Sequence, residues 1–600
     1  MLGITTNIYL LVLDRVYIGL PFWGGEFFNA YKLDFSKYIS DDITGVNSLS
    51  FEFPHLGVPA TLFDVIIHFP EMILLGVLVL VWICSPLNWV LLRSTRWVYN
   101  IAYLVLVSYV GAVCLLGFAA YCYDVEKGTL YVWYDALISD YYIVVVKLIF
   151  TCLGLVVLFF MAVSFNDSDG YLINRYWLFI LTATVLSGFI LLLSTNDFLS
   201  FYAVLEFVSL ITYVLPIVAK RDSGGVTASV VYYSSGAIAS AILLWGSVLV
   251  STEGAAFSFE KLETQWYQGN FTVTQIMGLI LILFAFAIKI ASFPAFSWVY
   301  DVYGNSEYSV LLVYAIIAKF GILGFFMRWY IILWPCLFQH YVFPVACLSI
   351  VTIVVGVLGA FYSFTRNDVK AFIGYTGINQ IGYILMGLCF VDNLEIINAT
   401  IYYFVAYLLA NLLFIGSLVY LSVNGLRVTQ FSELSLAYLG RYGTSYRYPI
   451  MVLGFSVWAM AGLPPFGNFF AKISLWSAIL ELLNNFFNFK STGFFLTFDS
   501  HFFVSLFSHQ LSAPVVLLIL LLCSVVTSIV SIYYYIGVIG HILSKVPTVL
   551  NSKDRRVLLQ DREVSFGWLT IVLFIVFLLS FWGIFLDDPF LVPSWLVCVI

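Results

Sequence analysis

Charged residues are scarce in this sequence. Only 10% of its 600 residues are Asp, Glu, Lys or Arg, whereas 62% are hydrophobic and the mean hydropathy is +1.01. A soluble domain needs a far more polar surface, so the composition excludes that class and indicates a bundle of membrane helices. The formal net charge of −7 is small for this length and gives no reason to expect a nucleic-acid partner.

Sequence signatures of bound cofactors are also lacking. The nine cysteines are scattered without a CxxC pair, and the six histidines share no spacing that would bind a metal. No glycine-rich phosphate loop follows a strand pattern. We therefore expect no metal, haem, iron–sulfur cluster, disulfide framework or nucleotide in this chain.

The first residues do not resemble a transit peptide. They are apolar where such peptides are rich in Arg and Ser, and Asp14 and Arg15 interrupt the apolar run. Residues 1–69 mix aromatic, Gly, Pro and acidic residues without a clear spanning run. We expect an N-terminal extension there.

Apolar runs long enough to cross a bilayer follow one another from Pro70 onward. A hydrocarbon core takes about 20 helical residues, and each run is long enough to cross it. The fourteen expected spans are 70–92, 98–122, 140–164, 175–195, 197–219, 226–252, 273–299, 307–330, 342–365, 370–391, 395–422, 449–482, 512–544 and 566–587. We assign residues 70–545 to a transport core and residues 546–600 to a polar loop and the last span.

Basic residues are distributed unequally between the loops. Most lie in loops that follow odd-numbered spans; loops that follow even-numbered spans carry only Lys127, Lys261, Arg328 and Lys490. The positive-inside rule places the odd-numbered loops on the matrix or cytoplasmic side. We call this the basic side, and the other the opposite side.

Five charged residues stand out inside the expected spans. They are Lys147, Lys289, Lys319, Lys472 and Glu206. A charge at the bilayer centre costs ~3 kcal/mol or more, so each needs a partner, water or a task. The structural alternatives are a carboxylate at a helix end that reaches water for Glu206, and side chains that snorkel to the interface for the lysines. For Lys147, snorkelling is as good an interpretation as a functional role. Buried lysines and acids that load and release protons suit a proton relay.

Two of these lysines lie beside prolines that should break a helix. In Ile288–Trp298, IKIASFPAFSW, Pro294 follows Lys289 by five residues. A similar but less regular pattern occurs in Ala461–Trp476, AGLPPFGNFFAKISLW, where Pro464 and Pro465 precede Lys472. Two broken helices, each with its lysine, indicate a repeated half and an ion path. Polar residues that could complete the path are Ser292, Ser297, Asn379, Gln380, Asn468 and Ser474.

These segments, in this order, resemble a known family. FPEMILLGVLVL, LLLSTNDFLSFYAVLEF (with Glu206), FAIKIASFPAFSWVYDVYGNSE (with Asp301), YAIIAKFGIL, NDVKAFIGYTGINQIGYILMGL (with Tyr375 and Gln380) and AGLPPFGNFFAKISLW resemble motifs of the antiporter-like N subunit, or subunit 2, of NADH:ubiquinone oxidoreductase. The resemblance to this subunit of respiratory complex I covers roughly residues 68–545.

The resemblance implies an all-α, antiporter-like bundle of about fourteen helices with two inverted five-helix repeats and two discontinuous helices. It implies a proton path through Glu206, Lys289, Lys319 and Lys472, with Lys147, Pro294, Asp301, Tyr375, Gln380, Pro464 and Pro465 in support. It also implies that NADH, FMN, iron–sulfur clusters and ubiquinone bind in other subunits, and that this chain carries none of them.

Expected partners are other membrane-arm subunits, including sister antiporter-like subunits, and lipids. The Phe- and Tyr-rich composition and the long N-terminal addition favour the mitochondrial inner membrane, with a bacterial plasma membrane as the alternative. Other readings remain: a subunit of a cation/proton antiporter, another antiporter-like subunit of the complex, or a structural subunit that has lost pumping.

Three positions depart from the family pattern. Val231 stands where a lysine is usual, so Glu206 lacks its expected partner; Lys220, Arg221 or another subunit could compensate. Gln380 replaces a histidine and cannot titrate. Ser297 stands near the place of the histidine in the first broken segment.

Overall fold

A computed structural model describes most of the chain between residues 68 and 543. The described residues are 50–53, 58–61, 68–87, 95–122, 130–132, 136–163, 172–220, 222–251, 258–259, 262, 272–389, 394–423, 426, 428–434, 444–492, 512–543, 575–578 and 580. Most of the expected last span, 566–587, and most of the expected N-terminal extension therefore lie outside the described residues.

The chain divides into two compact units, Met1–Ile66 and Ile67–Ile600. In the first unit the described elements are two antiparallel strands, β1 (Ser50–Phe53) and β2 (Val58–Thr61), paired from Ser50 opposite Thr61. In the second unit a similar pair, β3 (Leu130–Val132) and β4 (Leu137–Ser139), lies between two helices.

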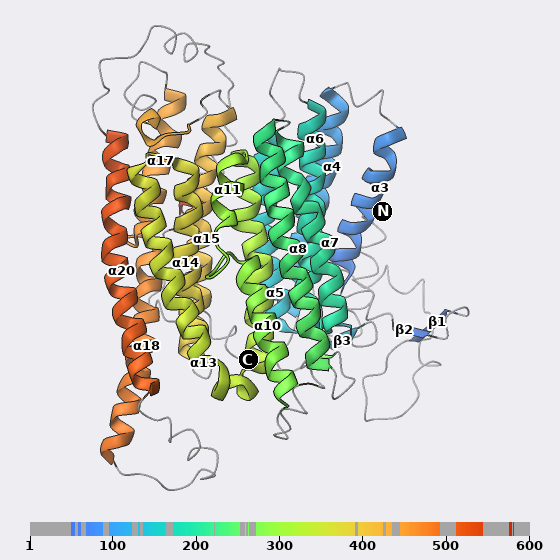
Figure 1. The fold of residues 1–600 in the computed structure, drawn as a ribbon. Helices are drawn as coiled ribbons and strands as arrows, with labels where there is room; N and C mark the ends of the chain where they lie inside the picture. Colours follow the sequence, from blue (N-terminus) through green and yellow to red (C-terminus); the bar gives the residue numbers. More distant parts are fainter. Residues whose placement is uncertain are drawn as a thin grey trace, which may run out of the picture. The chain divides into compact units, whose positions relative to one another are not determined.

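Helices make up nearly all of the described second unit (Figure 1). They are α3 (Phe69–Leu87), α4 (Thr95–Cys122), α5 (Tyr141–Val163), α6 (Leu172–Ser194), α7 (Phe198–Ala219), α8 (Ser223–Ser251), α10 (Val273–Lys289), α11 (Trp298–Asn305), α12 (Tyr308–Leu312), the π-helix η5 (Val313–Ala318), α13 (Lys319–Thr365), α14 (Val369–Leu388), α15 (Leu394–Val423), α17 (Thr444–Ala461), α18 (Gly467–Thr492) and α20 (Ser512–Leu543).

These helices correspond to the first thirteen expected spans, and of the fourteenth the described residues 575–578 are helical. Within the described residues, nine helical stretches are long and apolar enough to cross a membrane, and α3 and α10 contain shorter apolar stretches. The expected spans 307–330 and 342–365 are joined by continuous helix in α13. The first membrane-length stretch, Tyr308–Tyr330, starts in α12 and runs through η5 into α13, and the second, Val345–Thr365, lies within α13. The prediction of an all-helical membrane bundle is confirmed.

Two helices are discontinuous, as the prolines predicted. One breaks between α10 and α11, where Ala291 has a φ of 63°, and the other between α17 and α18, where Gly462 has a φ of 73°. A tryptophan indole closes each break: Trp298 Nε1 donates to Ile288 O at 3.1 Å, and Trp458 Nε1 donates to Pro464 O at 3.2 Å. These bonds tie a side chain to backbone carbonyls at each break, where the regular helix ladder is interrupted.

The two breaks occupy the same place in two successive sets of helices. The first set is α6, α7, α8, α10/α11 and α12 with the start of α13; the second is the end of α13, α14, α15, α17/α18 and α20. The broken helix is fourth in each set. Because each set has an odd number of crossings, the second starts on the other side of the membrane, as inverted repeats require.

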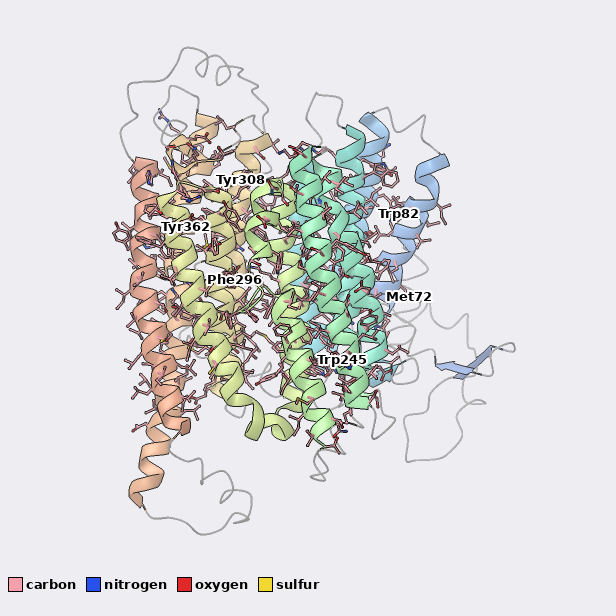
Figure 2. The ribbon with its side chains drawn as sticks, in the orientation of Figure 1. Met72, Trp82, Trp245, Phe296, Tyr308 and Tyr362 are labelled. Atoms are coloured by element: carbon pink, nitrogen blue, oxygen red, sulfur yellow. The ribbon has the colours of Figure 1, made fainter. Side chains whose placement is uncertain are left out.

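The centre of the bundle is the stretch from α12 through η5 into α13. Every residue of Tyr308–Tyr330 is buried, whereas the outer helices α4 and α20 bury only a minority of theirs. Figure 2 shows Met72, Trp82 and Trp245 projecting from outer helices, and all three are exposed in this chain. Apolar outer faces of this kind suit contact with lipid or other membrane subunits.

Glycines let neighbouring helices approach closely. A Cβ added at Gly246 on α8 would lie 2.8 Å from Gly278 O on α10, and one added at Gly278 would lie 2.7 Å from Gly246 O. Small residues at such crossings are the usual device of membrane helices. The α8–α10 crossing thus holds the first broken helix against its neighbour.

Candidate functional site

Glu206 lies half-buried on α7, two turns before Tyr213. Ser209 donates to its backbone oxygen at 2.9 Å and to its carboxylate at 3.3 Å. Lys220 does not compensate for the missing family lysine, since it pairs with Asp222 and hydrogen-bonds to it, lowering the pKa of that carboxyl. Lys220 is also fourteen residues along the chain from Glu206, about 21 Å of helix.

Lys289 lies close enough to Glu206 for their charges to interact. It is the last residue of α10, half-buried at the break, and its Nζ donates to the Tyr213 hydroxyl at 3.2 Å. Tyr213 comes from α7, the helix that carries Glu206. The first broken helix therefore supplies the partner that Val231, a half-buried apolar residue on α8, cannot.

Aromatic rings extend this contact toward the bundle centre. The Tyr232 ring packs edge-on against Tyr213 at 4.9 Å, stacks on Trp298 at 5.0 Å and meets Tyr314 at 5.0 Å. The Tyr314 hydroxyl donates to Thr212 O at 2.8 Å. Tyr314 lies in η5, five residues before Lys319, so the rings connect the surroundings of two of the predicted lysines.

Lys319 lies at the bundle centre, only 7% exposed. It directly follows η5, and π-helical turns are frequent at functional sites. Its Nζ donates to the Tyr407 hydroxyl at 3.4 Å, and Asn411 donates to the same hydroxyl at 3.2 Å. A Cβ at Gly377 on α14 would lie 3.3 Å from the Tyr407 hydroxyl and closer still to Lys319 Nζ, so only glycine leaves both groups in place.

Lys472 lies at the second break, 4% exposed. It is on α18, and its Nζ donates at 3.2 Å to Ala461 O, the last carbonyl of α17. The carboxyl end of a helix carries partial negative charge, which favours the protonated amine. Its Nζ also lies 5.5 Å from the centre of the Tyr383 ring.

Hydroxyl and amide groups lie between the last two lysines. The Tyr403 hydroxyl donates to Gln380 Oε1, and the Tyr403 and Tyr383 rings are 5.6 Å apart. The Tyr383 hydroxyl in turn donates to Ser524 O at 3.0 Å. Gln380 thus takes part in the polar core as a hydrogen-bond acceptor, as its chemistry predicted.

Two buried amides have no hydrogen-bond partner among the described residues. Both side-chain atoms of Asn379 and of Asn468 are unpaired, and the residues are 0% and 2% exposed. A buried amide without a partner costs about 1–3 kcal/mol, which bound water commonly offsets. These positions, beside Gln380 and beside the second break, are therefore expected water sites.

The predicted supporting residues fall into two groups. Pro294, Pro464 and Pro465 lie in the two breaks, where the lysines are. Asp301, on α11, is exposed, and Tyr375 is half-buried with its ring 6.4 Å from Tyr300. The structure does not bring Asp301 or Tyr375 into contact with the lysines.

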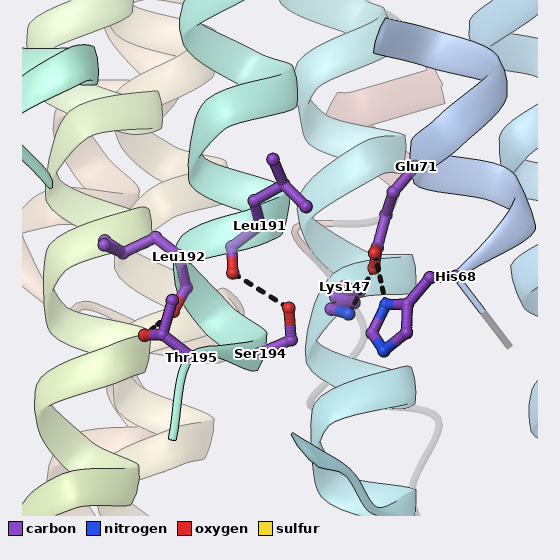
Figure 3. A network of polar contacts seen from close by, with 7 residues as sticks. All are labelled: His68, Glu71, Lys147, Leu191, Leu192, Ser194 and Thr195. Carbon is purple, nitrogen blue, oxygen red and sulfur yellow. Dashed lines mark hydrogen bonds and ion pairs between the residues drawn. The ribbon is translucent and has the colours of Figure 1, made fainter. Parts of the chain in front are cut away.

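Lys147 differs from the snorkelling alternative: it is buried inside the bundle on α5, 2% exposed. Its Nζ donates to Glu71 on α3, and His68 hydrogen-bonds to the other carboxylate oxygen (Figure 3). This buried ion pair was not predicted from the sequence, because Glu71 lies near the start of its span. The spacing of His68 and Glu71, three residues apart at a helix start, was the available signal.

No group of His, Cys, Asp and Glu that could hold a metal ion occurs among the described residues. The groups from Glu206 to Lys472 are instead amines, phenols, amides and the half-buried Glu206 carboxylate. Such groups can donate, accept and pass protons.

Comparison with known proteins identifies the family. The profile described as "NADH:quinone oxidoreductase/Mrp antiporter, TM" matches residues 195–497, just over half of the chain. The chain is 30% identical over 304 residues to the NADH-quinone oxidoreductase subunit N of Pelagibacter ubique, covering 50% of this chain and 62% of that protein. It is 28% identical over 323 residues to subunit N of Francisella tularensis, covering 53% and 63%. The matched part thus spans less than two thirds of these relatives.

Solved structures share the fold. A chain of respiratory complex I from Thermus thermophilus matches with a TM-score of 0.62 and 18% identity, covering 88% of this chain and 98% of that chain. A chain of the Mrp complex from Dietzia sp. matches with a TM-score of 0.65 and 19% identity, covering 90% and 97%. At such identities the likeness concerns the fold alone, and it confirms the antiporter-like bundle. Given the matched profile across both broken helices, this multi-pass membrane chain belongs to the NADH:quinone oxidoreductase/Mrp antiporter membrane family.

Proposed function

We propose that this chain is a proton-translocating membrane subunit of an NADH:quinone oxidoreductase of the complex I type. One observation carries the proposal: Lys289, Lys319 and Lys472 each lie inside the bundle beside a tyrosine, and two of them lie at helix breaks. None of the three forms an ion pair with an acidic side chain within the described residues. An amine without a fixed counter-charge is free to change its protonation state.

The path runs across the bundle from Glu206 to Lys472. Glu206 and Lys289 form its first pair: their charges interact, and Lys289 Nζ donates to the Tyr213 hydroxyl on the helix that carries Glu206. When a proton leaves or reaches Glu206, the preference of Lys289 for its charged form changes, because a neighbouring carboxylate favours the ammonium. A change in the charge of Lys289 affects the protonation of Lys319, and then of Lys472, in the same way. Phenols, amides and water carry the proton between these lysines.

Electron transfer belongs to other subunits in this proposal. NADH, FMN, iron–sulfur clusters and ubiquinone are assigned to them, and this chain responds to their reaction through conformation and charge. Its partners are other membrane-arm subunits, including sister antiporter-like subunits, with lipids on the exposed apolar faces. We assign it to the mitochondrial inner membrane; a bacterial plasma membrane fits the bacterial relatives.

A second candidate is a subunit of a cation/proton antiporter. It is favoured by the likeness to a chain of the Mrp complex, whose TM-score of 0.65 is close to the 0.62 of the complex I chain. The buried amines, phenols and amides would serve either assembly, so the two candidates are distinguished by the subunits that assemble with this chain.

Native purification in mild detergent tests the proposal. Co-purification with flavin, iron–sulfur centres and inhibitor-sensitive NADH:quinone activity is expected; isolation with only a few membrane proteins and no redox centre favours the antiporter. Lys319→Met in the whole assembly should then abolish proton translocation. If it left translocation unchanged in an assembled complex, the relay role of Lys319 would be wrong.

A further inference from the structure

A second cluster of ionisable groups lies outside the path from Glu206 to Lys472. His68, Glu71 and Lys147 are 2%, 3% and 2% exposed. Glu71, on α3, receives Lys147 on one carboxylate oxygen and His68 Nδ1 on the other (Figure 3). Charges this deeply buried are seldom kept without a function in a membrane protein.

Hydrogen-bond chemistry assigns the proton positions in this cluster. An ionised carboxylate only accepts, so Lys147 and His68 Nδ1 both donate to Glu71. The neutral imidazole then carries its hydrogen on Nδ1 and a lone pair on Nε2. His68 Nε2 is buried and has no hydrogen-bond partner among the described residues. It is therefore the atom at which a further proton can arrive, and water is its natural neighbour.

Further charges continue the cluster along α5. Asp140, directly before α5, lies seven residues from Lys147 and interacts with it electrostatically. Arg328 on α13 lies 3.7 Å from the Asp140 carboxylate and donates to Thr195 O at the end of α6. Burial raises the pKa of the Asp140 carboxyl, and the charges of Arg328 and Lys147 oppose that rise.

Other helices packed on α3 add no charge to the cluster. On α4, residues 100–117 include no Asp, Glu, Lys, Arg or His, and Arg175 of α6 pairs with Glu307 instead. With Glu71 and Asp140 ionised, Lys147 and Arg328 charged and His68 neutral, the cluster has no net charge. One more proton, on His68 Nε2, makes it +1.

The cluster lies toward the opposite side of the membrane. α3 is the first span and α5 is the third, so the segment before α3 and the loop before α5 both lie on the opposite side. Both helices therefore start there. Lys147 is six residues from the start of α5, about 9 Å of helix. Arg328 is nine residues beyond Lys319, about 13 Å along α13 in the same direction.

We propose that His68, held by Glu71 and Lys147, is a proton-release site that hands protons from the central lysines to the opposite side of the membrane. A proton binds His68 Nε2 while Nδ1 stays bonded to Glu71, and it leaves to water from the same atom, so the cluster returns to zero net charge. Imidazole suits this task because one ring nitrogen can keep its hydrogen bond while the other takes up and releases a proton. The proposal rests on the proposed function.

The test uses the whole assembly reconstituted in vesicles, with protons translocated per NADH oxidised as the readout. His68→Gln keeps a hydrogen-bonding side chain that does not titrate. We expect it to lower proton translocation by at least about tenfold and to flatten its pH profile. Glu71→Gln, which removes the charge that holds the imidazole, should shift that profile.

Gly76→Ala on α3 is the matched control, since a Cβ there meets nothing within 4 Å. Translocation per assembled complex that is unchanged in His68→Gln, with an unaltered pH profile, overturns the proposal. Lys319→Met separates this failure from failure of the proposed function. If Lys319→Met abolishes translocation and His68→Gln does not, only the release site is wrong; if neither alters it, the proposed function falls as well.

Discussion

Gly377→Ala tests whether the contact between Lys319 and Tyr407 conducts protons. The alanine Cβ would lie 3.3 Å from the Tyr407 hydroxyl and closer still to Lys319 Nζ. Since ordinary contacts need about 3.5 Å or more, the amine must move by several tenths of an ångström to about 1 Å. Its hydrogen bond to Tyr407 is already 3.4 Å long, so that displacement breaks it.

The size of the effect follows from the bond that is lost. A hydrogen bond to a charged group contributes about 1.5–3 kcal/mol, which corresponds to roughly 10- to 100-fold in rate if it forms in the transfer step. Stability should change little, because the atom that must yield is the far end of a flexible side chain. We expect normal assembly, normal NADH oxidation by artificial acceptors and proton translocation lowered by at least about tenfold.

Vesicle-based proton uptake per NADH oxidised measures this effect. Gly111→Ala on α4 is the control, since a Cβ there meets nothing within 4 Å. If Gly377→Ala assembles normally and pumps like the parent protein while Lys319→Met does not pump, protons do not cross the Lys319–Tyr407 contact. The assigned route would then need a different neighbour for Lys319.

Two further substitutions separate packing from proton transfer. Gly356→Ala should lower the amount and melting temperature of the assembled complex, by overpacking of about 1–3 kcal/mol, because its Cβ would lie 2.8 Å from Asn379 Cβ and closer still to its backbone nitrogen. Thermal denaturation measures this, and a melting temperature equal to that of Gly111→Ala would contradict the close helix crossing. Tyr213→Phe removes the hydroxyl that accepts from Lys289 at 3.2 Å, so proton translocation should fall roughly tenfold or more with little change in stability. Unchanged pumping by this variant, measured beside Lys289→Met, would show that Glu206 and Lys289 communicate without the phenol.

Much of the architecture was predictable from the sequence because a membrane helix can be recognised by the length and apolarity of its segment. Lysines inside apolar runs were visible without coordinates, as was the pairing of two of them with helix-breaking prolines. Lys319 and Lys472 are indeed buried, and both breaks occur where the prolines lie. The physical reason is local: an apolar run, a proline or a charge acts on its own segment.

Partners of these charges were decided only by the tertiary structure. Glu71 and Lys147 are 76 residues apart, and nothing in either segment shows that the two helices present these groups to each other. Val231 left Glu206 without a partner in the sequence, and the fold brought Lys289 to it instead. Asp301, chosen from a motif, turned out to be exposed. Composition and local pattern determined that the chain spans a membrane and where its helices break. Which face of each helix meets which neighbour, and hence which buried charges act on each other, depends on packing between distant segments.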